Sequence, residues 1–285
     1  MPKDAHASLA TELDSPDEEG FRAIGQPIRR KEDERLLTGK GRFSDDFSLP
    51  GQTYAVMARS PYPHARIVAI HKDSVAGMPG VLGVFTGRDV IAENIGAIPH
   101  EPLPSTKYDM KLLAPDGTRN AFVGPHYLLP ADRARHVGEA VAMIVAETRD
   151  QAEDAAEALR IDYEELPFVT GTAAAAQPGA PAVWDEVPDN TFIDTTFGDK
   201  DATDRAFARA DHIFSMDFHI DRVTGVPLEP RSALATVDTR TGNFTLWAGS
   251  GGAVRQKREL ATILGIPQDK LRLLSFDVGG NFGTR

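Results

Sequence analysis

The sequence predicts an α+β fold built from two consecutive units, and three observations support this prediction. A nearly continuous apolar run covers residues 137–146, as expected for a central strand that is buried on both faces. The helix expected from Arg149 to Leu159 follows, with alanines at helical spacing on one face and Thr148 as its N-cap. After a segment rich in alanine and proline, strand patterns, glycine clusters and a further helix pattern alternate toward residue 285.

The first unit is expected to contain short strands joined by turns. Residues 1–25 are polar and acidic, which predicts a flexible tail because such a segment buries too little apolar surface to become ordered. Pro61 and Pro63 separate two strands, since proline cannot donate to a strand ladder. Residues 95–130 are rich in proline and glycine and are expected to be irregular coil. The remaining expected elements are strands over 54–58, 65–71, 81–86 and 161–164 and a one-turn helix over 73–78.

A linker is expected between the units, because Pro178 and Pro181 interrupt the alanine run that precedes them. In the second unit, the turn Thr241-Gly242-Asn243 predicts a hairpin, and Gly265 should end a helix over 253–264. The hairpin strands are expected over 234–238 and 244–247, further strands over 192–197 and 271–276, a helix over 202–210, and an alternation of apolar and polar residues over 212–220.

The composition narrows the classes of function. A formal net charge of −11 disfavours nucleic acid and anionic membranes as partners, since both attract positive surfaces. No stretch reaches the roughly 20 apolar residues of a membrane-spanning helix, and the first residues lack the apolar segment of a secretion signal. We therefore expect a cytoplasmic protein with no membrane partner. The sequence has no cysteine, which excludes a thiolate-bound iron–sulfur cluster on this chain.

Two glycine clusters are the candidate binding loops. Residues 279–283 contain three glycines in five positions, so their backbone can adopt positive φ and approach a ligand closely. Ser250 and Gly251 belong to the second cluster, which precedes the helix over 253–264. The first N–H groups of a helix have no internal acceptor and attract anions. Each cluster by itself is also compatible with a tight bend that binds nothing.

Two further residues invite a functional interpretation. Glu229 lies between Pro227 and Pro230, so its carboxylate could orient a ligand, anchor a guanidinium or cap the neighbouring backbone. His64 has no second His, Asp or Glu at the spacing of a metal site, and we interpret it as structural.

The strand, glycine turn and helix near the end of the sequence are compatible with two kinds of cofactor. One is a nicotinamide-type dinucleotide, with Asp277 as the carboxylate that binds the ribose. That motif requires a third glycine at position 254, where the sequence has Val254. The other is one large, phosphate-bearing cofactor that both glycine clusters face.

Five motifs, in order along the chain, are RSPYPHA at 59–65, VGEAVA at 137–142, EPR at 229–231, LGIP at 264–267 and DVGGNFG at 277–283. With these motifs the chain, from about residue 25 onward, resembles the molybdenum-binding large subunits of the xanthine dehydrogenase, aldehyde oxidase and carbon monoxide dehydrogenase family. The resemblance implies an α/β hammerhead domain over 26–168, a linker over 169–182, and the N-terminal part of an α+β molybdopterin-binding domain over 183–285.

The resemblance implies a molybdenum hydroxylase that oxidises an aldehyde, an N-heterocycle or carbon monoxide with oxygen derived from water. Its cofactor would be molybdopterin, in the cytosine dinucleotide form, with molybdenum. Electrons would leave through iron–sulfur clusters and FAD on other subunits, in keeping with the missing cysteines. The backbone N–H groups of Gly279, Gly280, Asn281, Phe282 and Gly283 would face the pterin and the oxo ligands of the metal.

The sequence departs from the family pattern in places. Ser250 is followed by Gly251, where the family usually has a glutamine that contacts an oxo ligand, and Asn281 stands for the middle glycine of the terminal loop. The family's glutamate base and most of its cofactor contacts belong to the C-terminal half of the subunit. We therefore expect no catalytic residue, no metal ligand and no activity from this chain alone.

The expected partners are that C-terminal half, as a separate chain or a continuation, an iron–sulfur subunit, a flavin subunit and a small-molecule substrate. A non-catalytic assembly or binding module is the alternative, and a dinucleotide-binding domain is a further one.

Overall fold

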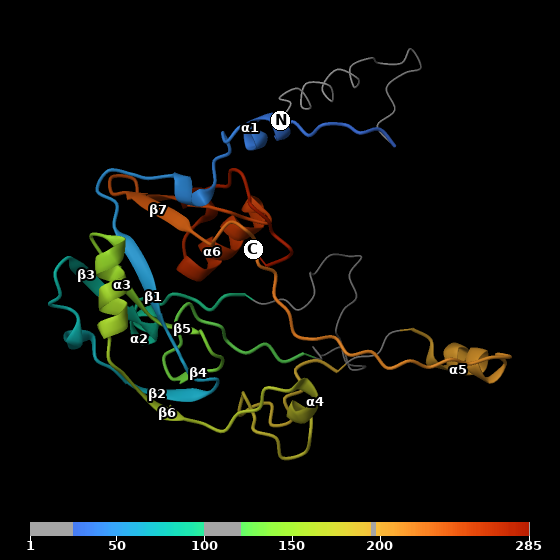
Figure 1. The fold of residues 1–285 in the computed structure, drawn as a ribbon. Coiled ribbons are helices and arrows are strands. Elements are labelled where there is room, and N and C mark those ends of the chain that lie inside the picture. The colour runs from blue at the N-terminus through green and yellow to red at the C-terminus, as the bar shows by residue number, and fades with distance from the viewer. Residues whose placement is uncertain (1–24, 100–120, 195–197, 285) are drawn as a thin grey trace, which may run out of the picture. The chain divides into compact units, whose positions relative to one another are not determined.

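The computed structural model describes residues 25–99, 121–194 and 198–284, and it confirms the predicted α+β fold (Figure 1). The chain divides into two compact units, residues 1–42 and 43–285. The first unit contains the short helix α1 (Asp33–Leu37), whose first residue forms an ion pair with Arg30 at 2.7 Å. Residues 1–24 of the predicted tail lie outside the described residues. No helix in the described part is long and apolar enough to cross a membrane.

The predicted apolar run forms the central strand of the first sheet in the second unit. β5 (Ala140–Ala146) pairs antiparallel with β1 (Tyr54–Arg59) on one side and with β3 (Val81–Thr86) on the other. The strand begins at Ala140 and not at residue 137, because Gly138 turns the chain with a φ of +85°. All its residues are buried or partly buried, which explains the apolar sequence.

Helix α3 (Arg149–Ala158) packs against β1 and β5. Its predicted N-cap is confirmed, since the Gln151 N–H donates to Thr148 Oγ1 at 3.3 Å. The alanines on its inner face let the helix approach the sheet closely, as the sequence spacing predicts. The core between them contains Ala58, Val75, Ala142, Ile144, Ala155 and Leu159.

A second sheet has the order β4-β2-β6. β2 (Ala65–Ile70) lies between β4 (Arg133–Ala134) and β6 (Ile161–Glu165), and both pairings are antiparallel. Figure 1 shows β2 and β6 side by side. A small apolar cluster of Ile67, Ala134 and Val141 includes residues from this sheet and from β5.

The connecting helices differ from the sequence prediction in detail. The expected one-turn helix over 73–78 is wrong in extent, since only the 3₁₀ turn η2 (Lys72–Ser74) forms and Pro79 follows soon after. Helix α2 (Gly87–Ala92) was not predicted, although Thr86 and Asp89 form a capping box at its start. The other short elements are η1 (Ser44–Asp46) and α4 (Thr172–Ala175).

The third sheet lies near the C-terminal end of the chain and has the order β7-β8-β9. β7 (Ala233–Asp238) and β8 (Asn243–Ala248) form the predicted antiparallel hairpin. Helix α6 (Ala253–Leu264) then connects β8 to β9 (Leu271–Leu274), which is parallel to β8. Gly265 ends α6 in the left-handed conformation, as predicted. The remaining elements are α5 (Lys200–Ala208) and η3 (Gln268–Lys270).

Two strand predictions in the second half are wrong or only partly right. Over 192–194 only an isolated antiparallel bridge forms, between Ile193 and Ala121. Just before it, Asn190 turns the chain with a φ of +57°, and its amide bonds the Val183 N–H and the Pro181 carbonyl, both at 3.0 Å. Residues 195–197 of that prediction lie outside the described residues. The last strand ends at Leu274 and not at residue 276. Over 212–220 no strand pairing is present in the described residues.

Candidate functional site

The parallel pairing of β8 and β9 brings the two predicted binding loops to one edge of the third sheet. In this pair Trp247 lies opposite Leu274, at the end of both strands. The chain leaves β8 into the cluster that holds Ser250 and Gly251, and it leaves β9 toward residues 279–283. Parallel strands deliver the loops at their carboxyl ends to the same edge, where ligands of such units bind.

The loop before α6 prepares an anion-attracting helix end. Ser250 Oγ accepts a hydrogen bond from the Gly252 N–H at 2.9 Å, so the serine side chain is used to shape the turn. The first turn of α6 contains no acidic residue that would neutralise its partial positive charge. Gly251 is exposed beside this turn. The helix start can therefore bind phosphate-like oxygens through its backbone N–H groups.

Gly279 contacts protein and not open space. Its N–H donates to Glu229 Oε2 at 2.8 Å, and the Glu229 N–H donates to the Gly279 carbonyl at 3.4 Å. A Cβ at position 279 would lie 2.5 Å from the Cβ of Glu229, so only glycine fits there. The other carboxylate oxygen of Glu229 accepts from the Ser44 N–H at 3.2 Å. Of the three roles considered for Glu229, the structure shows the capping of backbone.

Residues 280–282 form a strained turn in which two backbone N–H groups have no acceptor among the described residues. Gly280 has a φ of +112°, and Phe282 is a non-glycine residue at +50° with 75% of its surface exposed. Within the described part of the chain, the N–H groups of Gly280 and Phe282 donate to no protein acceptor. A turn that presents neighbouring free N–H groups is suited to bind an anion or a polarised oxygen.

The end of the loop is stabilised by Asn281. Its Oδ1 accepts from the Gly283 N–H at 2.8 Å, and its carbonyl accepts from the Thr284 N–H at 2.9 Å. Gly283 has a φ of +74°, and a Cβ there would meet nothing within 4 Å. Space beside this glycine is open, in contrast to the tight contact at Gly279.

The sequence did not predict the segment that supports the terminal loop. At alternate positions of an extended stretch, Gly225, Pro227 and Glu229 contact the loop. A Cβ at Gly225 would lie 2.9 Å from Thr284 Cγ2, and a Cβ at Gly280 would lie 3.1 Å from Pro227 Cβ. The period-two spacing of a glycine, a proline and a glutamate in 225–229 is the signal that could have indicated this role.

Titratable side chains contact the terminal loop at two points, where Glu229 accepts from the Gly279 N–H and Arg231 donates to the Thr284 carbonyl. In the described residues, no group of three or more His, Asp or Glu side chains is arranged to hold a metal. His64 is buried, and its Nδ1 lies 3.0 Å from the Pro167 carbonyl, so the structural interpretation is confirmed. The site can bind and orient a ligand through backbone donors.

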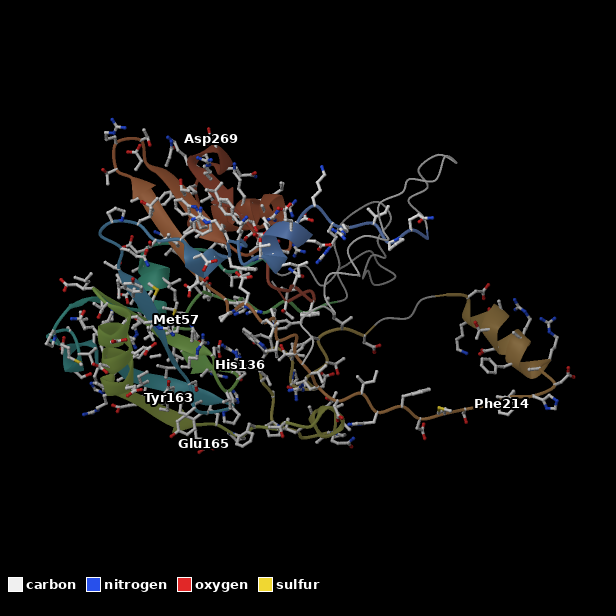
Figure 2. The ribbon with its side chains drawn as sticks, turned by 45° about the horizontal axis from the view of Figure 1, so that its top comes forward. Met57, His136, Tyr163, Glu165, Phe214 and Asp269 are labelled. Atoms are coloured by element: carbon white, nitrogen blue, oxygen red, sulfur yellow. The ribbon has the colours of Figure 1, made fainter. Side chains whose placement is uncertain are left out.

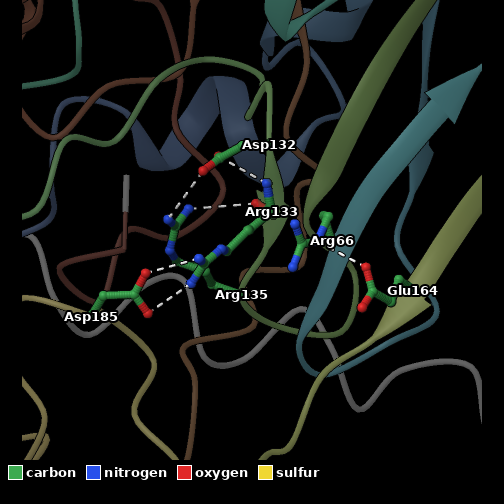
Figure 3. A network of polar contacts seen from close by, with 6 residues as sticks. All are labelled: Arg66, Asp132, Arg133, Arg135, Glu164 and Asp185. Carbon is green, nitrogen blue, oxygen red and sulfur yellow. Dashed lines mark hydrogen bonds and ion pairs between the residues drawn. The ribbon is translucent and has the colours of Figure 1, made fainter.

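A separate polar network ties β4 to the segment after the predicted linker (Figure 3). Arg133 donates to both carboxylate oxygens of Asp185 at 3.0 and 2.8 Å, and this hydrogen bonding lowers the pKa of Asp185 and raises that of Arg133. Arg135 stacks on Trp184 with 3.8 Å between its guanidinium carbon and the ring centroid. Each charge has a partner, so the network is structural in character.

Two cavities of the described part, of about 510 and 620 Å³, contain none of the predicted site residues. The first is lined by residues of β2, α2 and their neighbours, and the second by residues around Trp184 and His136.

Two families match successive parts of the chain. Residues 38–167 match the family described as aldehyde oxidase and xanthine dehydrogenase, a/b hammerhead domain. Residues 183–285 match the molybdopterin cofactor-binding domain. The finer boundaries predicted from the sequence, 26–168, 169–182 and 183–285, stay predictions.

Individual relatives agree with these matches. The chain is 33% identical over 264 residues to the nicotine 6-hydroxylase large subunit of Paenarthrobacter nicotinovorans, covering 92% of this chain and 30% of that protein. It is 31% identical over 267 residues to the carbon monoxide dehydrogenase large chain of Hydrogenophaga pseudoflava, covering 90% and 31%.

Among solved structures, the chain is similar to quinoline 2-oxidoreductase from Pseudomonas putida 86. The TM-score is 0.77 with 31% sequence identity, covering 92% of this chain and 31% of that chain. The chain thus spans about 30% of the length of the curated relatives described here.

Proposed function

This chain belongs to the family of molybdenum-binding large subunits of xanthine dehydrogenase, aldehyde oxidase and carbon monoxide dehydrogenase, and from this premise we propose that it forms one wall of a molybdopterin site. The observation that supports the proposal most is the parallel pairing of β8 with β9, which gives both glycine loops a common edge. The complete enzyme would be a molybdenum hydroxylase that oxidises an aldehyde, an N-heterocycle or carbon monoxide.

The residues of the site fit such a group. The free N–H groups of Gly280 and Phe282 are donors for acceptor atoms of the pterin or its metal centre, and the open space at Gly283 leaves room for a bulky ring. The helix start beyond Ser250 and Gly251 suits the phosphates of the cofactor, for which we propose the cytosine dinucleotide form. Gly279 and Asn281 hold the loop in shape through Glu229 and Gly283.

When bound, the molybdenum cofactor supplies the transfer of water-derived oxygen to the substrate and accepts two electrons. The residues of this chain bind and orient the cofactor, because their donors are backbone groups fixed before the ligand arrives. No side chain at the loop is proposed to move a proton. The acid–base residue and the remaining contacts would come from the rest of the molybdenum subunit, so this chain alone would be inactive.

The proposed partners supply the groups that this chain does not contain. With no cysteine, this chain cannot hold a thiolate-bound iron–sulfur cluster, so we propose that such clusters and a flavin lie on other subunits. The polypeptide that supplies the remaining length of the relatives, as a continuation or as a separate chain, would complete the cofactor site.

Purification of the tagged protein from its natural host tests the proposal. We expect a complex in which molybdenum, measured by inductively coupled plasma mass spectrometry, and pterin, measured by the fluorescence of its oxidised form, are stoichiometric with this chain. A stable monomer that lacks both would contradict the proposal and favour a non-catalytic module. Titration with nicotinamide dinucleotides in the same preparation tests the further alternative, and we expect no binding.

A further inference from the structure

Residues 213–221 form an extended segment in which apolar and polar side chains alternate from Phe214 to Asp221. Apolar side chains occupy the even positions, and Ser, Asp, His and Asp occupy the odd positions from 215 to 221. This period of two is typical of a β-strand with one apolar and one polar face. The apolar positions are Phe214, Met216, Phe218 and Ile220.

The segment has the shape of a strand but no partner. His219 Nε2 and Asp221 Oδ1 lie 3.0 Å apart, as side chains two residues apart do on one face of an extended chain. Within the described residues it pairs with none of the sheets. Figure 2 labels Phe214 on this segment beyond α5, and 92% of its surface is exposed.

The exposed apolar residues continue into the segment that supports the terminal loop. Val226 and Leu228 are 78% and 99% exposed, whereas the alternate residues between and beside them contact the loop over 279–284. Leaving several large apolar side chains in water is unfavourable, and such a patch usually marks an interaction surface. The patch consists of Phe214, Met216, Phe218, Ile220, Val226 and Leu228.

We propose that residues 213–221 complete a β-sheet whose neighbouring strand belongs to the remaining part of the molybdenum subunit. This inference rests on the proposed function. The remaining part of the subunit would offer an open strand edge for backbone hydrogen bonds and an apolar layer that covers the even-numbered side chains.

The length of the chain and the charge of the segment both point to this neighbouring strand. This chain spans about 30% of the length of the two curated relatives named above, and the segment lies inside the part that matches the molybdopterin cofactor-binding domain. The polar face carries Asp217 and Asp221, which favours a partner strand with basic or neutral side chains opposite them. Self-pairing centred on Asp217 would set two identical carboxylates opposite each other, which is unfavourable.

Hydrogen–deuterium exchange on the complex purified from the natural host tests the inference. At least every second amide of 213–221 should exchange ~100-fold or more slowly than an unstructured chain, because strand pairing uses alternate N–H groups. Free exchange along the segment in a complex that contains molybdenum would overturn this inference and leave the proposed function intact. Protection without molybdenum, beside an unrelated partner, would overturn the proposed function together with the assigned occupant.

Two substitutions on opposite faces sharpen the test. Phe218→Asp should lower the exchange protection of 213–221 by ~10-fold or more and, where the remaining part is a separate polypeptide, its recovery with the tagged chain as well, since buried aromatic residues dominate such contacts. Ser215→Asp adds the same charge to the polar face and should change both quantities less than about twofold. Equal losses in both variants, or protection that arises in a homodimer without other polypeptides, would overturn the proposal.

Discussion

Residues 54–165 and residues 198–284 have similar secondary structure but very different cores. In the first region, Val141, Ala142, Ile144 and Ala155 have no exposed surface at all. In the second, the described residues that are buried are few: Ala248, Ala261, Ile263 and Leu271. The contrast suggests that the first region is stabilised by its own packing, whereas the second is stabilised in large part by what covers it.

The difference has a topological cause. The first region places a full strand on either side of β5 and packs α3 against the same sheet, so its core is closed. The second region has a three-stranded sheet, and its apolar segment over 213–221 lies outside it. Helix α6 packs on β9 and buries Ala261, Ile263 and Leu271, so the second region has only a small core of its own. The chain's two tryptophans offer separate reporters, with Trp184 near Phe122 and Arg135 and Trp247 on β8.

The largest effect is expected at Gly280, where a substitution should cause loss of the cofactor but leave the fold intact. Gly280→Val should reduce the molybdenum content of the purified complex ~10-fold or more, because the residue has a φ of +112° and a Cβ would crowd Pro227 at 3.1 Å. Metal analysis measures the effect, and the Trp184 fluorescence should stay native. Gly242→Asn, at a positive φ in the β7–β8 turn with open space around it, is the control and should keep its molybdenum. Normal metal content in Gly280→Val would argue against the site.

The closed core can be weakened selectively. Ile144→Ala should reduce the free energy of unfolding by about 2–5 kcal/mol, because Ile144 is fully buried and its removal leaves a cavity. The urea transition of the full chain followed through Trp184, with Trp247→Phe in the background, should move to lower urea. The transition followed through Trp247, with Trp184→Phe, should move much less. Equal shifts of both transitions would break the distinction between the two regions.

Removal of the carboxylate that supports the terminal loop should have an effect of intermediate size. Glu229→Ala leaves the N–H groups of Gly279 and Ser44 without their carboxylate acceptor, at a cost of about 1–3 kcal/mol for a buried donor. The Trp247 transition should shift, and Glu229→Gln should shift it less, since the amide oxygen can still accept one of the two bonds. If both variants unfold like the wild-type chain, Glu229 does not stabilise the loop.

The smallest effect concerns acid stability of the first region. Burial opposes the ionisation of Asp89, but the hydrogen bonds from Lys72 and Thr86 outweigh it and lower the pKa of this carboxyl. A lowered folded pKa stabilises the fold above the ordinary aspartate value of about 3.9, and this stabilisation is lost as pH falls below it. Asp89→Asn should flatten the decline of the Trp184 midpoint below about pH 4. Asp73→Asn is the matched control and should leave the decline unchanged.

Much of the fold could be predicted because its signals are local. The apolar run of β5, the Thr148 cap and the Thr241-Gly242-Asn243 turn each specify an element from neighbouring residues. The sequence favoured an anchor for a guanidinium or a cap of backbone as the role of Glu229, but it could not indicate Gly279 as the partner, since the two residues are 50 positions apart. The alternation over 212–220 was recognised, but the sequence does not show which strand pairs with it.

A structure of the complete complex, determined by electron cryo-microscopy, tests the central claim most directly. The account predicts a pterin cofactor at the carboxyl ends of β8 and β9, with acceptor atoms within about 3 Å of the Gly280 and Phe282 nitrogens. A pterin bound elsewhere, with residues 279–283 in contact only with protein or solvent, would contradict it.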